Sequence, residues 1–155
     1  MIRRAKFGDI PEIYNLIVEG HQRSKYRDRD VIDTKEAKGL LMNAIQRDNV
    51  KRAGGTCVFV TDEVDGFIMG ALTRVYYVGT KLSAQDAFYY CRPTVHPGDA
   101  VGLLGEYMAW ATGIPEVIEI RNTITDVIGD VAKVEAIYTR AGFTRCGVVM
   151  ERKIK

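Results

Sequence analysis

The segment from Ala84 to Ala111 combines a strand pattern, a tight turn and the start of a helix, an arrangement that could bind an anion. The first turn of a helix leaves backbone N–H groups without partners, and the helix dipole favours negative charge there. Gly98 and Asp99 lie at this turn. Asp99 is also a good N-cap, and a capping carboxylate would occupy the donors that a phosphate would use. The residues therefore predict either an anion site or a self-capped helix.

Composition excludes several classes of function. The chain has 155 residues, a net charge of +2, 46% hydrophobic and 27% charged residues, which is typical of an ordinary globular protein. This charge is too weak to indicate a nucleic-acid partner. The N-terminus has no apolar leader, and no apolar run approaches the roughly 18 residues of a membrane span. We therefore expect a cytoplasmic protein with no nucleic-acid or membrane partner.

The three cysteines, Cys57, Cys91 and Cys146, are odd in number and far apart. They form no Cys-x-x-Cys pair and have no Cys/His spacing that is typical of zinc ligands. We expect buried, reduced thiols and no metal site.

Hydrophobic periodicity and turn residues predict how these groups are positioned. The expected order is βααβββαβαβ, which predicts an α/β fold around a mixed sheet. Asp9 with Glu12 three residues later is a candidate capping box for the first helix, and Asp33 or Thr34 is the candidate cap of the second. No linker or repeat is present, so we expect a single domain over residues 1–155. The expected strands are 1–7, 56–61, 67–77, 84–95, 117–124 and 143–154, and the expected helices end near residues 20, 48, 111 and 140.

This order resembles the GNAT superfamily of acyl-CoA-dependent N-acyltransferases. The hairpin 64–70, with its Asp-Gly turn, is similar to the family's second hairpin. Val95-His-Pro97 resembles the V-x-P that closes the family's fourth strand, and residues 136–143 match its late A-x-Y-x-x-x-G-F element. The resemblance covers nearly the whole chain. It implies a GNAT-like fold and transfer of acetyl from acetyl-CoA to a primary amine of a small molecule or peptide.

The family's cofactor signature, Q/R-x-x-G-x-G/A, is incomplete in this chain. Counted from Val95, its slots fall on Ala100, Leu103 and Gly105, of which only Gly105 matches. Moving the register back by one residue also gives a single match. Leu103 in a glycine slot would direct a bulky side chain toward the phosphates unless the helix is rotated. The resemblance implies that acetyl-CoA is held by Val95, Val101, Gly102, Leu103 and Gly105.

The resemblance also implies catalytic roles. Tyr138 lies where the family's general acid lies, and a phenol is protonated at neutral pH and can donate to a thiolate. Asp86, early in the fourth strand, is the best acidic candidate for the base. Tyr89 and Tyr90 should point to opposite faces of that strand, and one of them could line the substrate cleft. His21 lies in the loop that usually forms the acceptor wall.

The departures from the family pattern support a second hypothesis. Pro93 has no N–H to pair with the pantetheine arm, and Val131 stands where the family often places an asparagine. Together with Ala100 and Leu103, they favour a catalytically lapsed GNAT-fold protein that serves as a structural or protein-interaction component of a larger assembly. The last expected strand, 143–154, could pair across a homodimer, as in some family members, or could belong to the core.

Overall fold

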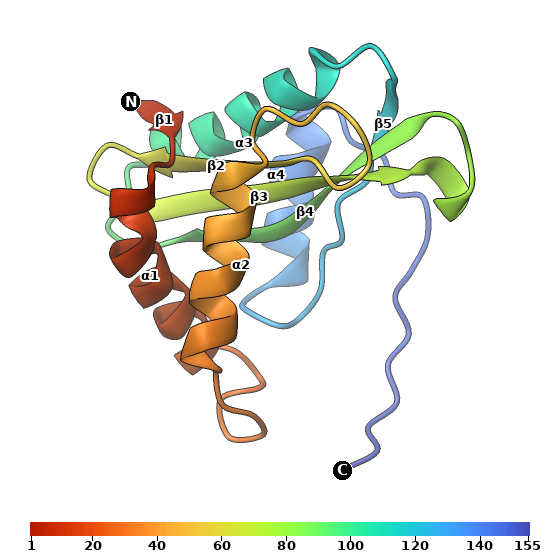
Figure 1. Ribbon diagram of the computed structural model, residues 1–155. Coiled ribbons are helices and arrows are strands. Elements are labelled where there is room, and N and C mark those ends of the chain that lie inside the picture. Colours follow the sequence, from red (N-terminus) through yellow and green to blue (C-terminus); the bar gives the residue numbers. More distant parts are fainter.

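The protein is built on a five-stranded mixed sheet. The computed structural model describes residues 1–155. The strands lie in chain order across the sheet, antiparallel from β1 to β4, whereas β5 is parallel to β4. This order confirms the expected α/β fold with a mixed sheet (Figure 1). The strands are β1 (Ile2–Arg4), β2 (Thr56–Thr61), β3 (Gly66–Arg74), β4 (Leu82–Cys91) and β5 (Val117–Ile120).

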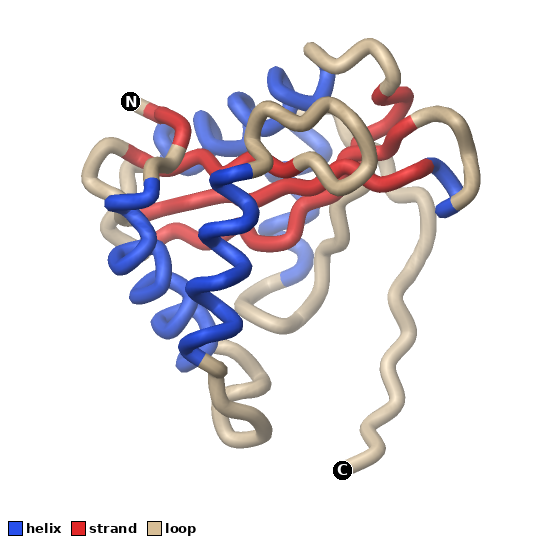
Figure 2. Tube along the Cα trace, viewed as in Figure 1, coloured by secondary structure: helices blue, strands red, loops and turns tan.

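Two pairs of helices cover the two faces of the sheet, as Figures 1 and 2 show. One buried cluster packs α1 and α2 against the sheet, and a second packs α3 and α4 against the opposite face. No helix in the structure is long and apolar enough to cross a membrane. The helices are α1 (Ile10–Gln22), α2 (Thr34–Gln46), α3 (Pro97–Thr112) and α4 (Val131–Arg140), with short 3-10 turns at Phe7–Asp9 and Val75–Tyr77.

The helix caps match the expectation in α2 but not in α1. Asp33 caps α2, and its carboxylate accepts the Glu36 N–H at 3.0 Å. Asp9 stands at the N-cap position of α1 without making a capping hydrogen bond. Its carboxylate accepts instead from the Lys6 N–H at 2.7 Å and from both terminal nitrogens of Arg3. The expected capping box between Asp9 and Glu12 is therefore wrong, because a bidentate arginine competes successfully for the carboxylate.

The expected strand at 143–154 is absent. Residues 143–155 form no helix or strand, and Figure 1 shows them leaving the body of the protein after α4. Val148, Val149 and Met150 are exposed by 64–86%, so the alternative that this segment belongs to the core is wrong. Its alternating pattern predicts a strand only where a neighbouring edge pairs with it. The third strand also ends early, because Tyr76 and Tyr77 have positive φ angles of 54° and 61°.

All three cysteines are free thiols, but they differ in burial. Cys57 lies in the core, and its burial raises the pKa of its thiol to about 12. Cys91 is half-buried, whereas Cys146 is exposed on the segment after α4. The expectation of buried thiols is thus confirmed for Cys57 and wrong for Cys146.

Candidate active site

Strands β4 and β5 separate after a short parallel stretch. Their pairing runs from Leu82 opposite Val117 to Ala84 opposite Ile120, and it ends where the Arg121 N–H donates to the Ala84 carbonyl at 2.8 Å. Beyond this point β4 continues to Cys91 without a strand partner on that side. The backbone edge of β4 over residues 86–91 is therefore open, and it can pair with an extended ligand.

A β-bulge at Ala87 decides where Asp86 points. In the pairing of β3 with β4, Met69 lies opposite Phe88 and Gly70 lies opposite Asp86, so Ala87 has no partner. An extra residue reverses the alternation of side chains along a strand. Asp86 consequently shares a face with Tyr89, the face covered by α3 and α4, and not the face of Phe88.

The bulge brings Asp86 to Tyr138, the two residues that the sequence proposed as base and acid. Tyr138, on α4, is 4% exposed, and its hydroxyl donates to Asp86 Oδ2 at 3.3 Å. Its ring is fixed edge-on by Phe143, with centroids 5.1 Å apart. This contact gives the A-x-Y-x-x-x-G-F element a packing role in addition to any chemical one.

Burial acts on the proton affinity of both groups. It raises the pKa of the Asp86 carboxyl above its ordinary value, although the Thr123 N–H and the Tyr138 hydroxyl oppose this shift. Burial, followed by the nearby charge of Asp86, raises the pKa of the Tyr138 phenol. Asp86 is thus a strengthened base beside a phenol that keeps its proton at neutral pH.

An apolar chamber of about 550 Å³ lies next to this pair. Its walls come from α1, α2, the loop between them, β4, α4 and the loop that follows β5, and they include both Asp86 and Tyr138. His21 also lines the chamber, and its Nε2 is buried without a hydrogen-bond partner. His21 therefore lines the same chamber as Asp86 and Tyr138, a grouping that the sequence alone did not predict.

Tyr89 and Tyr90 point to opposite faces of β4, as expected. Tyr90 belongs to the core beneath α1 and α2, whereas Tyr89 packs with the α3 and α4 cluster. Both residues line the chamber. The Tyr89 hydroxyl donates to the Ala100 carbonyl and so fixes the first turn of α3 against β4.

At the turn from β4 into α3, the backbone N–H groups of the first helical turn find acceptors within the chain. Residues 92–96 form the connection, and α3 begins at Pro97, which has no N–H. His96 is the N-cap, and its Nδ1 accepts the Gly98 N–H at 3.0 Å. The N–H groups of Asp99 and Ala100 both donate to the His96 carbonyl. The helix is capped from within the chain, but the expected cap, Asp99, is wrong, because His96 makes the capping hydrogen bond. Asp99 lies 3.4 Å from the terminal amino group instead.

The proposed cofactor-binding residues of α3 offer little to a phosphate. Val101, Gly102, Leu103 and Gly105 all follow the first turn of α3, so their N–H groups belong to the helix. The Leu103 side chain is fully buried in the core, which removes the expected clash with a phosphate. Gly102 packs closely against β1, because a Cβ atom there would lie 3.1 Å from Ile2 Cγ1. Gly105 faces open space.

Few unpaired donors remain in the connection itself. The Val95 N–H donates to the Arg92 carbonyl at 3.1 Å, so it is not free to donate to a cofactor as the resemblance implied. The N–H groups of Thr94 and His96 make no hydrogen bond within the chain. A diphosphate would therefore find two free backbone donors before α3 begins.

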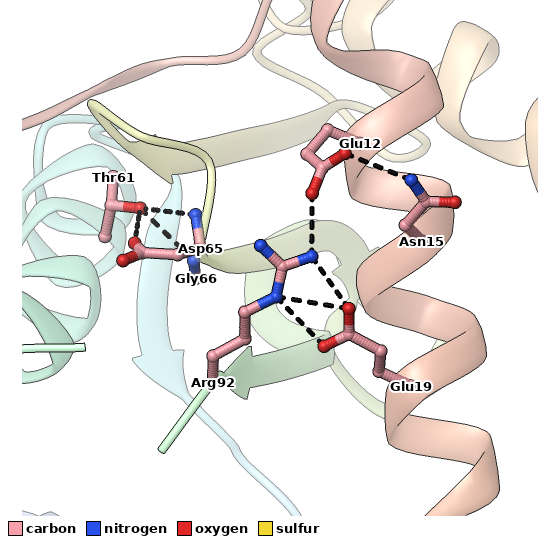
Figure 3. A network of polar contacts seen from close by, with 7 residues as sticks. All are labelled: Glu12, Asn15, Glu19, Thr61, Asp65, Gly66 and Arg92. Atoms are coloured by element: carbon pink, nitrogen blue, oxygen red, sulfur yellow. Dashed lines mark hydrogen bonds and ion pairs between the residues drawn. The ribbon is translucent and has the colours of Figure 1, made fainter. Parts of the chain in front are cut away.

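Arg92, the one arginine of this connection, is held away from such a ligand. Figure 3 shows its guanidinium between two carboxylates of α1, with Nη2 at 2.7 Å from both Glu12 Oε1 and Glu19 Oε1. The Arg92 N–H also donates to the Asp65 carbonyl at 2.9 Å, in a hairpin turn whose Thr61 hydroxyl accepts the Gly66 N–H. These contacts fix the end of β4 and neutralise Arg92.

Solved structures share this fold over nearly the whole chain. The glucosamine-6-phosphate N-acetyltransferase from Arabidopsis thaliana has a TM-score of 0.69 and 8% identity, with 100% of this chain and 98% of that one covered. An aminoglycoside acetyltransferase from an uncultured soil metagenomic sample, in complex with sisomicin, has a TM-score of 0.67 and 18% identity, with 100% and 96% covered. An integron cassette protein from the mobile metagenome of Cole Harbour Salt Marsh has a TM-score of 0.70 and 18% identity, with 99% and 90% covered.

No protein-family model and no curated protein matches the sequence. The likeness to solved acetyltransferases is one of fold, because all of these identities lie below 20%. It confirms the GNAT-like fold that the sequence predicted. Activity has to be argued from the site itself.

Proposed function

We propose that this protein is an N-acetyltransferase that moves acetyl from acetyl-CoA to a primary amine. The observation that carries the proposal is the pair formed by Asp86 and Tyr138 beside the open edge of β4. Solved acetyltransferases with the same fold add support. The catalytic pair and the open strand edge fit the thioester end of acetyl-CoA, whereas the turn before α3 fits its diphosphate poorly.

Acetyl-CoA supplies an activated thioester when it is bound. The open edge of β4 provides backbone donors and acceptors that bind and orient an extended arm. Asp86 takes one proton from the bound ammonium, and its raised pKa strengthens it as a base. The neutral amine then attacks the thioester carbonyl. A C–N bond forms while the C–S bond breaks. Tyr138 delivers its proton to the leaving sulfur and recovers one from Asp86, so the first proton of the ammonium ends on the thiol. The second proton, which the nitrogen loses as the amide forms, passes through the regenerated Asp86 carboxylate to solvent.

A lapsed site is the second candidate, and the His96 cap favours it. His96 takes up a backbone donor of the turn, and Glu12 and Glu19 neutralise Arg92, so few donors and no free positive charge remain there to bind a phosphate. In this alternative the chain keeps the fold as a structural or protein-interaction component of a larger assembly.

Acetyl-CoA binding separates the two candidates. The purified protein is titrated with acetyl-CoA while its melting temperature is recorded, because a ligand that binds the folded state stabilises it by mass action. The enzyme hypothesis expects saturable binding in the micromolar range, followed by release of free thiol that depends on added amine. No shift at millimolar acetyl-CoA would reject the enzyme and leave the assembly component, which a stable partner in a pull-down would support.

A further inference from the structure

We propose that the acceptor is a hydrophobic monoamine: one primary amine on an apolar body of about the size of an aromatic ring with a short chain. This proposal rests on the proposed function and assigns the chamber beside Asp86 and Tyr138 as the acceptor site.

The walls of the chamber match an apolar body. Sixteen of the twenty-two residues that line it are hydrophobic. They come from every element around it, with Leu16 on α1, Leu40 on α2, Phe88 on β4, Ile128 in the loop after β5 and Val134 on α4. A chamber of about 550 Å³ lies within the range of small-molecule sites and holds one compact ligand. A sugar would leave most of its hydroxyl groups without partners against these walls.

The charges of the chamber select a single amine. Asp86 is the only carboxylate among the lining residues, and no lysine or arginine is among them. Burying an ammonium is costly unless a carboxylate pairs with it, and Asp86 compensates one such charge. A polycationic acceptor would bring further ammonium groups without partners, and a phosphorylated acceptor would find no lysine or arginine in the walls.

One cation beside the chamber, Lys25, is already paired. Lys25 Nζ lies 2.7 Å from Asp126 Oδ1 and also contacts Glu151. The backbone N–H of Lys25 donates to the Val127 carbonyl at 3.1 Å. These contacts join the loop after α1 to the loop after β5, two of the chamber walls. Lys25 therefore ties two walls of the chamber together, and its charge is neutralised by Asp126 and Glu151. Arg23, whose Nη1 lies 3.5 Å from the Tyr90 hydroxyl, does not line the chamber.

The first experiment compares acceptors on the wild-type protein. 2-Phenylethylamine, glucosamine 6-phosphate and sisomicin are each supplied with acetyl-CoA, and release of free thiol is followed. We expect kcat/KM for 2-phenylethylamine to exceed both others by at least 100-fold. Equal or faster turnover of either polar amine would overturn the proposal and leave the proposed function intact.

The second experiment measures binding of 2-phenylethylamine alone by calorimetry in a matched pair of variants. Leu40 and Met42 lie on α2 and are similarly exposed, at 45% and 48%, but only Leu40 lines the chamber. Leu40→Asn should raise Kd at least 10-fold, whereas Met42→Asn should change it less than 2-fold. 2-Phenylethanol, which has no ammonium for Asp86, should bind the wild type at least 10-fold more weakly. Equal effects of the two variants, or no binding by the wild type, would overturn the proposal.

The two experiments separate this proposal from the function beneath it. Saturable, Leu40-dependent binding of 2-phenylethylamine without any turnover would support the chamber assignment and reject the acetyltransferase. Turnover of a polar amine without binding of 2-phenylethylamine would support the acetyltransferase and reject the chamber as a site for a hydrophobic amine.

Discussion

The two ends of the open β4 edge use their polar groups in opposite ways. At the bulge, Asp86 and Tyr138 are brought together from β4 and α4 beside a chamber. At the turn into α3, the His96 side chain and carbonyl take up the donors of the first helical turn. At the bulge, a carboxylate and a phenol face a chamber that a ligand could enter. At the turn, the N–H groups of the first helical turn, which could bind a ligand, already donate to His96. Polar groups that can do chemistry and polar groups that could bind a phosphate are thus governed by separate parts of this fold.

The energetic cost of the two regions also differs. Burial raises the pKa of Asp86, which means that the folded state disfavours the carboxylate that chemistry would need. The His96 cap, in contrast, stabilises the helix it begins. A destabilising carboxylate in a lined chamber is typical of a functional site, and this contrast favours the enzyme over the lapsed protein.

Asp86→Asn should produce the largest effect. Loss of a general base should lower kcat by about 10²- to 10⁴-fold, measured as amine-dependent thiol release. The unfolding free energy of the variant, in contrast, should not fall. The folded pKa of Asp86 lies above its ordinary value, so its contribution to the unfolding free energy falls as pH rises from the unfolded toward the folded pKa. The variant should therefore be as stable as the wild type, or more stable, at neutral pH.

Thermal unfolding of Asp86→Asn and wild type between pH 4 and pH 8 provides the control for this prediction. A variant that loses activity because it unfolds more easily at neutral pH would show a structural role for Asp86 and remove the contrast between the two regions.

Tyr138→Phe should have the next largest effect. Removing the phenolic proton donor should lower kcat by about 10- to 100-fold while KM for acetyl-CoA stays within about 3-fold. Tyr107→Phe is the matched control, because the buried Tyr107 hydroxyl donates to Asn122 Oδ1 at 3.0 Å and makes no hydrogen bond with Asp86. Similar steady-state rates in the two variants would remove Tyr138 from the mechanism.

His96→Ala tests the other end of β4. Loss of the cap should lower the unfolding free energy by about 1 kcal/mol. It should also free the Gly98 N–H, and we expect acetyl-CoA to bind about 3- to 10-fold more tightly by calorimetry. Weaker binding would instead make His96 a ligand of the cofactor and would reverse the interpretation of this turn.

Arg92→Met should have the smallest effect. The Arg92 side chain is 28% exposed and its partners Glu12 and Glu19 are 40% and 37% exposed, so the network should contribute only about 1 kcal/mol, or about 2–4 °C in Tm. Arg92 lowers the pKa of Glu12, so this stabilisation is complete above the ordinary pKa of Glu12 and is lost as pH falls below it. The variant should show a flatter loss of Tm below about pH 5 than the wild type. An increase in Kd for acetyl-CoA of more than 10-fold would show that Arg92 serves the cofactor.

Much of the fold could be predicted from local patterns. The strand at 56–61 and the cap at Asp33 were predicted correctly, because β-branched runs and capping chemistry depend on nearby residues. The segment 143–154 was predicted wrongly, because a strand also needs an edge to pair with. Competition for Asp9 from Arg3 was likewise invisible, since it depends on how β1 packs against the next turn.

In the candidate site, too, local features could be predicted from the sequence and features set by tertiary packing could not. Asp86 and Tyr138 could be named from residue type and resemblance, but their approach depends on the bulge at Ala87, which no sequence signal marks. The cap at His96 was missed because histidine is an unusual N-cap and Asp99 has the better propensity. The motif register left open whether Leu103 faces the phosphates or α3 is rotated, and packing against the sheet buries Leu103 in the core.

Amide hydrogen exchange with and without acetyl-CoA would show whether the cofactor binds along the open edge of β4. We expect acetyl-CoA to slow exchange in peptides covering residues 86–91, where the backbone edge has no strand partner. The matched strand β2, which is paired on both sides, should be unaffected. Unchanged exchange in residues 86–91 at saturating acetyl-CoA would contradict the assignment of this edge as the site of acetyl transfer.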